Sequence, residues 1–143
     1  MTVPAWAGWA LLSATFAALT AIFAKVGLQS VNADFATLIR TGMILAILGV
    51  FVLGTDQWQS PGTIGARTWG FLTLSAIATG ASWVCYFRAL KLGDVSQVSA
   101  VDKFSLVLVA VFAFALLHDR PSPRDWVGII FVAAGILMLA FKR

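Results

Sequence analysis

The segment FATLIRTGMILAILGVFVL, residues 35–53, decides the fold, because its only charged side chain is Arg40. An apolar run of about 20 residues is long enough to cross the hydrocarbon core of a bilayer as an α-helix. Similar runs lie before and after it, at residues 4–24, 68–90, 95–117 and 126–141. Short polar turns join these runs, so the sequence predicts five transmembrane helices and leaves no segment large enough for a soluble domain.

The composition agrees with this prediction. Hydrophobic residues make up 60% of the chain and charged residues 11%, whereas about 25% of a soluble globular domain is charged. Lipid offers no hydrogen bonds to the backbone, and runs this long with weak alternation are not barrel strands, so they are expected to be helices. We therefore expect an all-α transmembrane protein of the cell membrane, a five-helix bundle in one membrane domain over residues 1–143.

The distribution of basic residues predicts an orientation. The membrane face that holds the C-terminus carries seven Lys and Arg, and the face that holds the N-terminus carries three: Lys25, Arg40, Arg88, Lys91, Lys103, Lys142 and Arg143 against Arg67, Arg120 and Arg124. The positive-inside rule then favours an outside N-terminus and an inside C-terminus. Without Arg40 and Lys103, which lie at membrane depth, the counts are five and three. A bias this small leaves open insertion in both orientations, which would give an antiparallel homodimer.

Three ionisable residues fall well inside the predicted spans. A charge at the centre of a transmembrane helix costs about 2.5 to 3.5 kcal/mol, so Arg40, Asp102 and Lys103 need partners. Arg40 lies six residues beyond Asp34, and Asp102 lies six beyond Ser96. Both are therefore about 9 Å deep from the same membrane face. We predict an Arg40–Asp102 pair, which either fixes helix register or forms part of a substrate or coupling-ion site.

We make different predictions for the other cations in and near these spans. Lys103 should point away from Asp102, because adjacent helix positions do not face each other. Lys25, Arg88 and Lys91 lie close enough to the membrane surface for their long side chains to reach water.

A polar stripe follows one face of the third run. Its members are spaced by four, three and four residues, as on one side of a helix: Ser75, Thr79, Ser82 and Tyr86. Such a stripe either lines a water-accessible cavity, with Trp83 beside it, or lets helices pack closely. In the last run, Gly128, Val132 and Gly135 share a face and predict a close helix contact, either within the chain or between subunits.

The sequence argues against an enzyme and against a cofactor or metal site. It has one histidine, His118, no glutamate and one cysteine, Cys85, which we expect to be a small buried hydrophobe. No nucleophile–base pair, phosphate loop or metal-ligand spacing appears. The basic residues are scattered at helix ends, which argues against nucleic-acid binding.

Three stretches resemble a known family. WVCYFRALKLGDVSQVSAVDKFS, residues 83–105, resembles the segment from helix 3 to helix 4 of EamA-type transporters in the drug/metabolite transporter superfamily. LHDRPSPRDWVGIIFVAAGILML, residues 117–139, is similar to the last turn and helix of that family, and ATLIRTG, residues 36–42, to the start of its helix 2. The resemblance covers the chain but only one of the two five-helix repeats of longer members. It implies one repeat of an inverted-repeat transporter.

The resemblance implies a function. The chain would be a secondary transporter of small organic solutes or metabolites, working by alternating access as a homodimer or paired half-transporter. The candidate pathway residues are Arg40, Asp102, Lys103, Trp83, Tyr86, Ser82 and Thr79. Arg40 or Lys103 would hold an anionic group, and Asp102 would exchange a proton or ion. The alternative is a non-transporting membrane subunit that stabilises or regulates a larger complex and docks through its last helix.

Overall fold

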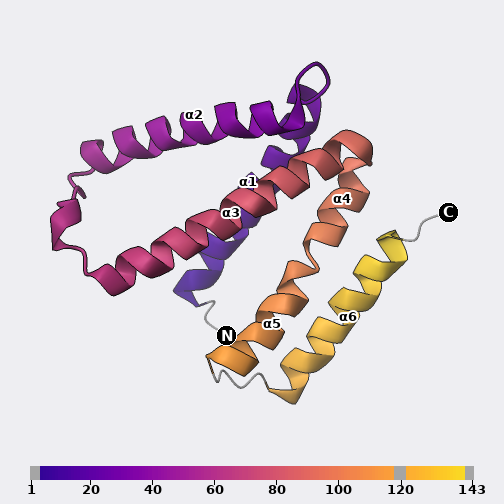
Figure 1. The fold of residues 1–143 in the computed structure, drawn as a ribbon. Helices are drawn as coiled ribbons and strands as arrows, with labels where there is room; N and C mark the ends of the chain where they lie inside the picture. The colour runs from indigo at the N-terminus through magenta and orange to yellow at the C-terminus, as the bar shows by residue number, and fades with distance from the viewer. Residues whose placement is uncertain (1–3, 118–121, 141–143) are drawn as a thin grey trace. The chain divides into compact units, whose positions relative to one another are not determined.

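The computed structural model describes residues 4–117 and 122–140, and all regular structure in these ranges is helical. Figure 1 shows the elements in chain order, which are α1 (Ala5–Gly27), α2 (Ala33–Gly54), the short 3₁₀ helix η1 (Pro61–Thr63), α3 (Ala66–Leu92), α4 (Val95–Asp102), α5 (Ser105–Leu116) and α6 (Pro123–Ala140). Within the described ranges, five spans are long and apolar enough to cross a membrane, with α4 and α5 together forming the fourth. The predicted all-α, five-span architecture is confirmed.

Polar side chains cap the starts of α2 and α6, which begin before their predicted first residues, 35 and 126. The Asn32 Oδ1 accepts hydrogen bonds from the backbone N–H groups of Asp34, at 2.9 Å, and Phe35, at 3.3 Å, at the start of α2. At the start of α6, the Asp125 carboxylate accepts from the backbone N–H and hydroxyl of Ser122, at 2.8 and 2.7 Å. Such caps satisfy backbone donors that have no partner inside the helix.

The fourth span is interrupted, so the prediction of one continuous helix over residues 95–117 is wrong at one point. Between α4 and α5, the N–H groups of Lys103 and Phe104 donate to carbonyls three residues back, at 3.1 and 2.9 Å. The N–H groups of Leu106 and Val107 also donate to carbonyls three residues back, each at 3.0 Å. This spacing is that of a tighter 3₁₀ turn. No residue type predicted this turn, because the span contains neither glycine nor proline.

The chain forms two compact units, described separately here. The first is residues 23–91 and contains the end of α1, α2, η1 and α3. Its buried side chains come from the α1–α2 corner and from facing turns of α2 and α3, and are Leu28, Ala33, Thr37, Phe87 and Leu90.

The second unit combines residues 1–22 with residues 92–143. In it α6 packs against α4 and α5. The rings of Phe114, on α5, and Trp126, on α6, meet edge to face with centroids 6.3 Å apart. Ile136 is buried, whereas most of the large apolar side chains of α5 and α6 are exposed on the chain. Lipid or another protein surface must cover such a surface in a membrane.

Candidate functional site

An arginine lies on an aromatic cluster between α2 and α3. The guanidinium carbon of Arg40 is 3.6 Å from the centre of the Trp83 ring and 5.6 Å from that of Phe87. Trp83 also meets Tyr86 and Phe87 edge to face, with centroids 6.0 and 5.8 Å apart. A cation over the face of tryptophan is attracted by the ring quadrupole, most strongly where water is excluded. The aromatic rings therefore attract the positive charge of Arg40.

Helix periodicity brings these residues together. Thr37 and Arg40 are three residues apart on α2, and Trp83 and Phe87 are four apart on α3, so each pair shares a helix face. Thr37 is buried, and its hydroxyl donates to the Ala33 carbonyl at 2.9 Å. Phe87 is the aromatic member that the sequence reasoning missed. Its spacing from Trp83, and from Leu90 three residues later, is the signal that could have found it.

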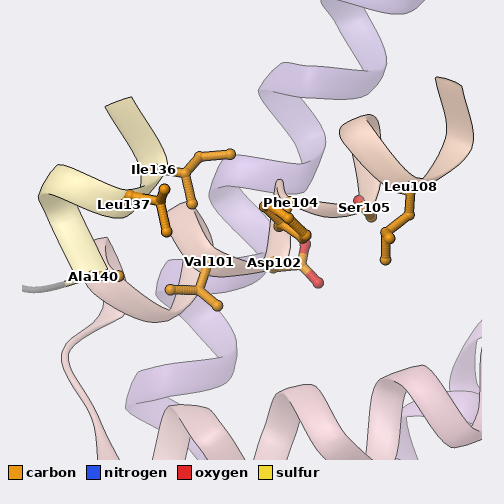
Figure 2. Close-up of a pocket in the computed structure, with 8 residues that line it drawn as sticks. All are labelled: Val101, Asp102, Phe104, Ser105, Leu108, Ile136, Leu137 and Ala140. Carbon is orange, nitrogen blue, oxygen red and sulfur yellow. The ribbon is translucent and has the colours of Figure 1, made fainter. Parts of the chain in front are cut away.

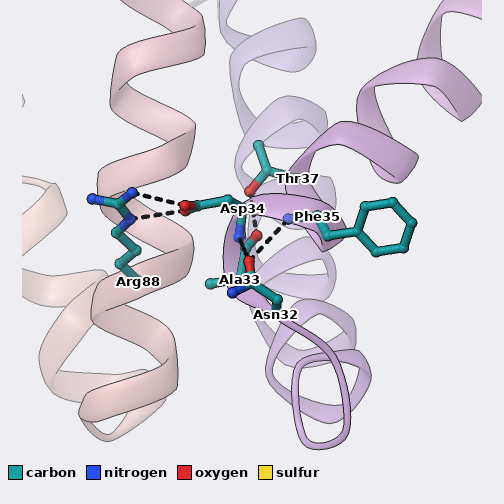
Figure 3. Close-up of polar contacts among 6 residues, drawn as sticks. All are labelled: Asn32, Ala33, Asp34, Phe35, Thr37 and Arg88. Carbon is teal, nitrogen blue, oxygen red and sulfur yellow. Dashed lines mark hydrogen bonds and ion pairs between the residues drawn. The ribbon is translucent and has the colours of Figure 1, made fainter.

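A second arginine, five residues beyond Trp83 on α3, makes a different contact. Figure 3 shows Arg88 on α3 with its guanidinium directed at Asp34 on α2. The Nε–Oδ1 distance is 2.8 Å and the Nη2–Oδ2 distance is 2.7 Å. Two parallel hydrogen bonds of this kind match the planar fork of arginine to a carboxylate. Arg88 therefore pairs with Asp34 instead of only extending toward water, and the sequence reasoning missed this pair.

Two lysines bind backbone carbonyls at the same end of α3. The Lys25 Nζ donates to the Leu90 carbonyl at 2.6 Å, and the Lys91 Nζ donates to the Val31 carbonyl at 2.5 Å. Leu90 lies in the last turn of α3, where carbonyls lack helical partners and the helix dipole favours a cation. Both ammonium groups thus bind backbone carbonyls within the first unit, and their predicted reach toward water stays a prediction.

The interruption of the fourth span lines an open groove in the second unit. Figure 2 shows side chains of α4, α5 and the turn between them facing the end of α6. The groove has a volume of about 420 Å³ and is lined by Val101, Asp102, Phe104, Ser105, Leu108, Ile136, Leu137 and Ala140. Asp102 supplies the only charge among these residues, and Ser105 is the only other polar residue in the lining.

Asp102 and Lys103 form an ion pair, contrary to the prediction that they point apart. The Lys103 Nζ lies 3.4 Å from the Asp102 Oδ2. The rule for adjacent positions assumes a continuous α-helix, and the α4–α5 turn replaces it here. The predicted Arg40–Asp102 pair involves one residue from each unit and stays a prediction.

The remaining predicted residues have simpler surroundings. Thr79 and Ser82 are exposed on α3, about two turns and one turn before Tyr86. Cys85 is also exposed, so the prediction that it is buried is wrong. In the described part of the chain, no three His, Cys, Asp or Glu side chains lie close enough together to hold a metal ion. His118 lies outside the described residues.

The small-residue face of α6 has no close neighbour in the described ranges. Gly128, Val132 and Gly135 are exposed, and a Cβ added to either glycine would meet no atom within 4 Å. Of the two contacts predicted for this face, the one between subunits therefore stays a prediction.

Comparison with known proteins identifies the family. Residues 4–141 match the EamA-like transporter family. The chain belongs to this family. An EamA-like relative from Sinorhizobium sp, named "Uncharacterized transporter in cobO 3'region", is 56% identical over 135 residues, which are 94% of this chain and 96% of the relative. The chain is thus a multi-pass membrane protein of a transporter family.

More distant relatives carry a more specific name. A protein of Salmonella paratyphi B named "Probable 4-amino-4-deoxy-L-arabinose-phosphoundecaprenol flippase subunit ArnE" is 25% identical over 105 residues, covering 68% of this chain and 95% of the relative. A protein of the same name from Salmonella enteritidis is 27% identical over 107 residues, with the same coverage of both chains. No solved structure matches the chain.

Proposed function

We propose that the chain is a secondary transporter of a small organic solute that works by alternating access as a dimer of five-span repeats. The observation that carries the proposal is the interrupted fourth span. Transporters of inverted-repeat architecture bind solutes and ions where a membrane helix is discontinuous, because the break frees polar groups at membrane depth. Here the Asp102–Lys103 pair and an open groove lie at the break.

The proposed pathway combines polar groups from both units. In the first unit it includes Arg40, Trp83 and Tyr86, with Thr79 and Ser82 continuing along α3. In the second it includes Asp102 and Lys103. Polar and charged side chains are costly in lipid, so each of these groups needs water or a polar partner beside it.

The dimer is proposed because the chain holds a single repeat. Alternating access in inverted-repeat transporters involves one repeat moving against another, and a second copy would supply the missing one. The exposed face of Gly128, Val132 and Gly135 on α6 supports a subunit contact, because small residues let helices approach closely. The small charge bias allows an antiparallel arrangement, and an outside N-terminus is the preferred orientation of a single copy. The word "subunit" in the name of the Salmonella relatives also supports an assembly.

The solute class is proposed from the same comparison. The Salmonella relatives are named for a flippase of a lipid-linked sugar, 4-amino-4-deoxy-L-arabinose-phosphoundecaprenol. A substrate screen should therefore include amphipathic, lipid-linked molecules of that kind as well as water-soluble metabolites.

Solute flux into proteoliposomes tests the proposal, with Asp102→Asn as the informative variant. If Asp102 exchanges a proton or ion, the variant should lose the dependence of flux on a pH or ion gradient while still binding solute. Asp94→Asn is the matched control, because Asp94 is an exposed acid before α4, outside the proposed pathway. Gradient dependence that is unchanged in Asp102→Asn would remove the coupling role.

The other function that the sequence left open has its own outcome in this experiment. A non-transporting subunit would show no flux with any solute and would co-purify with an unrelated complex. A self-dimer stabilised by a transported solute would support transport, because a ligand that binds only the folded state raises its stability.

A further inference from the structure

The cations of the first unit differ in what neutralises them. Arg88 has the Asp34 carboxylate, and Lys25 and Lys91 have backbone carbonyls. Arg40 and Arg67 are the exceptions, since within residues 4–117 and 122–140 no acceptor atom forms a hydrogen bond or ion pair with either guanidinium. Arg67 is exposed in the first turn of α3, beside the Phe71 ring. Arg40 instead lies within its span, against the Trp83 and Phe87 rings and near enough to Tyr86 for an electrostatic interaction.

The ring contact of Arg40 does not use its hydrogen-bonding capacity. A guanidinium is flat, and its five N–H bonds lie in its plane. The guanidinium carbon lies 3.6 Å from the centre of the Trp83 ring, and an indole offers no hydrogen-bond acceptor. The ring therefore attracts the charge and holds the group in place, while the N–H donors gain no hydrogen bond from it.

An unsatisfied cationic donor at this depth is costly. Arg40 lies about 9 Å along α2 from Asp34, where water is scarce and each unmade hydrogen bond of a charged group costs free energy. A ligand with two oxygens side by side would remove this cost. Carboxylates and phosphates have that shape, and they bind arginine through two parallel hydrogen bonds.

Resting on the proposed function, we propose that Arg40 is the binding site for an oxyanionic group, a phosphate or carboxylate, of the transported solute. The oxyanion lies against the edge of the guanidinium, and Trp83 positions the fork from its face. Lys103, the other cation considered for this role, has Asp102 3.4 Å away, which already offsets its charge. The inference narrows the solute to an organic anion or an amphipathic molecule with an anionic head.

Anion binding to the full-length, detergent-purified protein tests this site. Thermal unfolding is followed in sodium phosphate, sodium acetate and sodium chloride at equal ionic strength. A lipid headgroup as the source of the oxyanion is tested in phosphatidylcholine nanodiscs with and without phosphatidic acid. We expect at least one of phosphate, acetate and phosphatidic acid to stabilise the wild type above its chloride or phosphatidylcholine control. A response to the soluble anions indicates a free solute, and a response to phosphatidic acid alone indicates a lipid headgroup.

Three variants assign the response to Arg40. Arg40→Gln should weaken anion binding by about tenfold to hundredfold, the loss expected for hydrogen bonds to a charged group. Arg40→Lys keeps the charge but not the fork, so it should bind more weakly than the wild type even if Arg40→Gln fails to fold. Arg88→Gln, which removes an arginine that already has a carboxylate partner, should bind anions as the wild type does.

Three results would overturn the inference. The first is equal anion stabilisation of the wild type and Arg40→Lys, and the second is no stabilisation of the wild type by any of the three probes. The third is binding that appears only in Asp102→Asn, because Asp102 would then be the acceptor for Arg40. The readout is independent of transport. Arg40-dependent binding without flux contradicts only the proposed function, and flux without such binding contradicts only the present inference.

Discussion

Arg40 and Arg88 project from the two helices of one hairpin, yet their guanidinium groups have different surroundings. Arg88 donates two short hydrogen bonds to Asp34, and this pair is well exposed, with 62% and 47% of the two side chains accessible. Arg40 has an indole ring on one face and, within the described residues, no anion at its edge. Arg88 therefore uses its hydrogen-bond donors within the protein, whereas the donors of Arg40 remain available to a ligand. We expect Arg88 to matter for stability and Arg40 for ligand binding.

The largest effect should be on transport. Arg40→Ala is expected to lower solute flux by about tenfold or more, because it removes charge-assisted hydrogen bonds to the solute. Arg88→Ala should leave flux per folded protein close to the wild type. Flux is measured in proteoliposomes that contain equal amounts of folded protein. A loss in Arg88→Ala as large as that in Arg40→Ala would end the proposed division of roles.

An intermediate effect is expected at the ring under Arg40. A cation–π contact contributes about 0.5 to 2 kcal/mol, so Trp83→Leu should weaken anion binding by roughly twofold to thirtyfold. Trp83→Phe keeps an aromatic face and should lose less. The control is Trp69→Leu on the same helix, whose indole donates to the Pro61 carbonyl at 3.4 Å. If both leucine variants bind anions equally well, Trp83 does not position Arg40.

The smallest effect should come from the exposed pair. Asp34→Ala and Arg88→Ala should each lower the melting temperature only modestly, because exposed ion pairs contribute little. The exchange of both residues, Asp34→Arg with Arg88→Asp, should recover part of the loss. Thermal unfolding of the four proteins gives the coupling between the two sites. Additive losses without recovery would mean that the 2.7 Å contact contributes nothing to stability.

Much of the fold could be predicted from the sequence because the bilayer imposes simple constraints. Apolar runs of the right length must be helices, and each of the five predicted spans has ends within three residues of the observed ones. The cap at Asn32 shows why the ends were less accurate, since α2 begins two residues before its apolar run. The 3₁₀ turn at Lys103 was missed because it depends on local backbone hydrogen bonds and not on glycine or proline.

The candidate site was predictable only in part. Arg40, Asp102 and Lys103 stood out because charges are rare at membrane depth, and Trp83 and Tyr86 because large amphipathic rings lay on a polar stripe. Their partners did not follow from the sequence. Asp34 served only as the reference for the depth of Arg40, and Phe87 was one apolar residue among many. Which side chains meet across two helices depends on how the helices rotate and tilt, and the hydropathy of each span does not specify that.

The sequence by itself determined that the chain crosses a membrane five times as helices, because the hydrophobic effect and the need for internal backbone hydrogen bonds act on each span separately. The tertiary structure alone decided which cation has a partner: Asp34 meets Arg88, carbonyls meet Lys25 and Lys91, and Trp83 meets Arg40. Such contacts require distances of a few ångströms between groups up to 65 positions apart in the chain. Only the packing of helix against helix sets these distances.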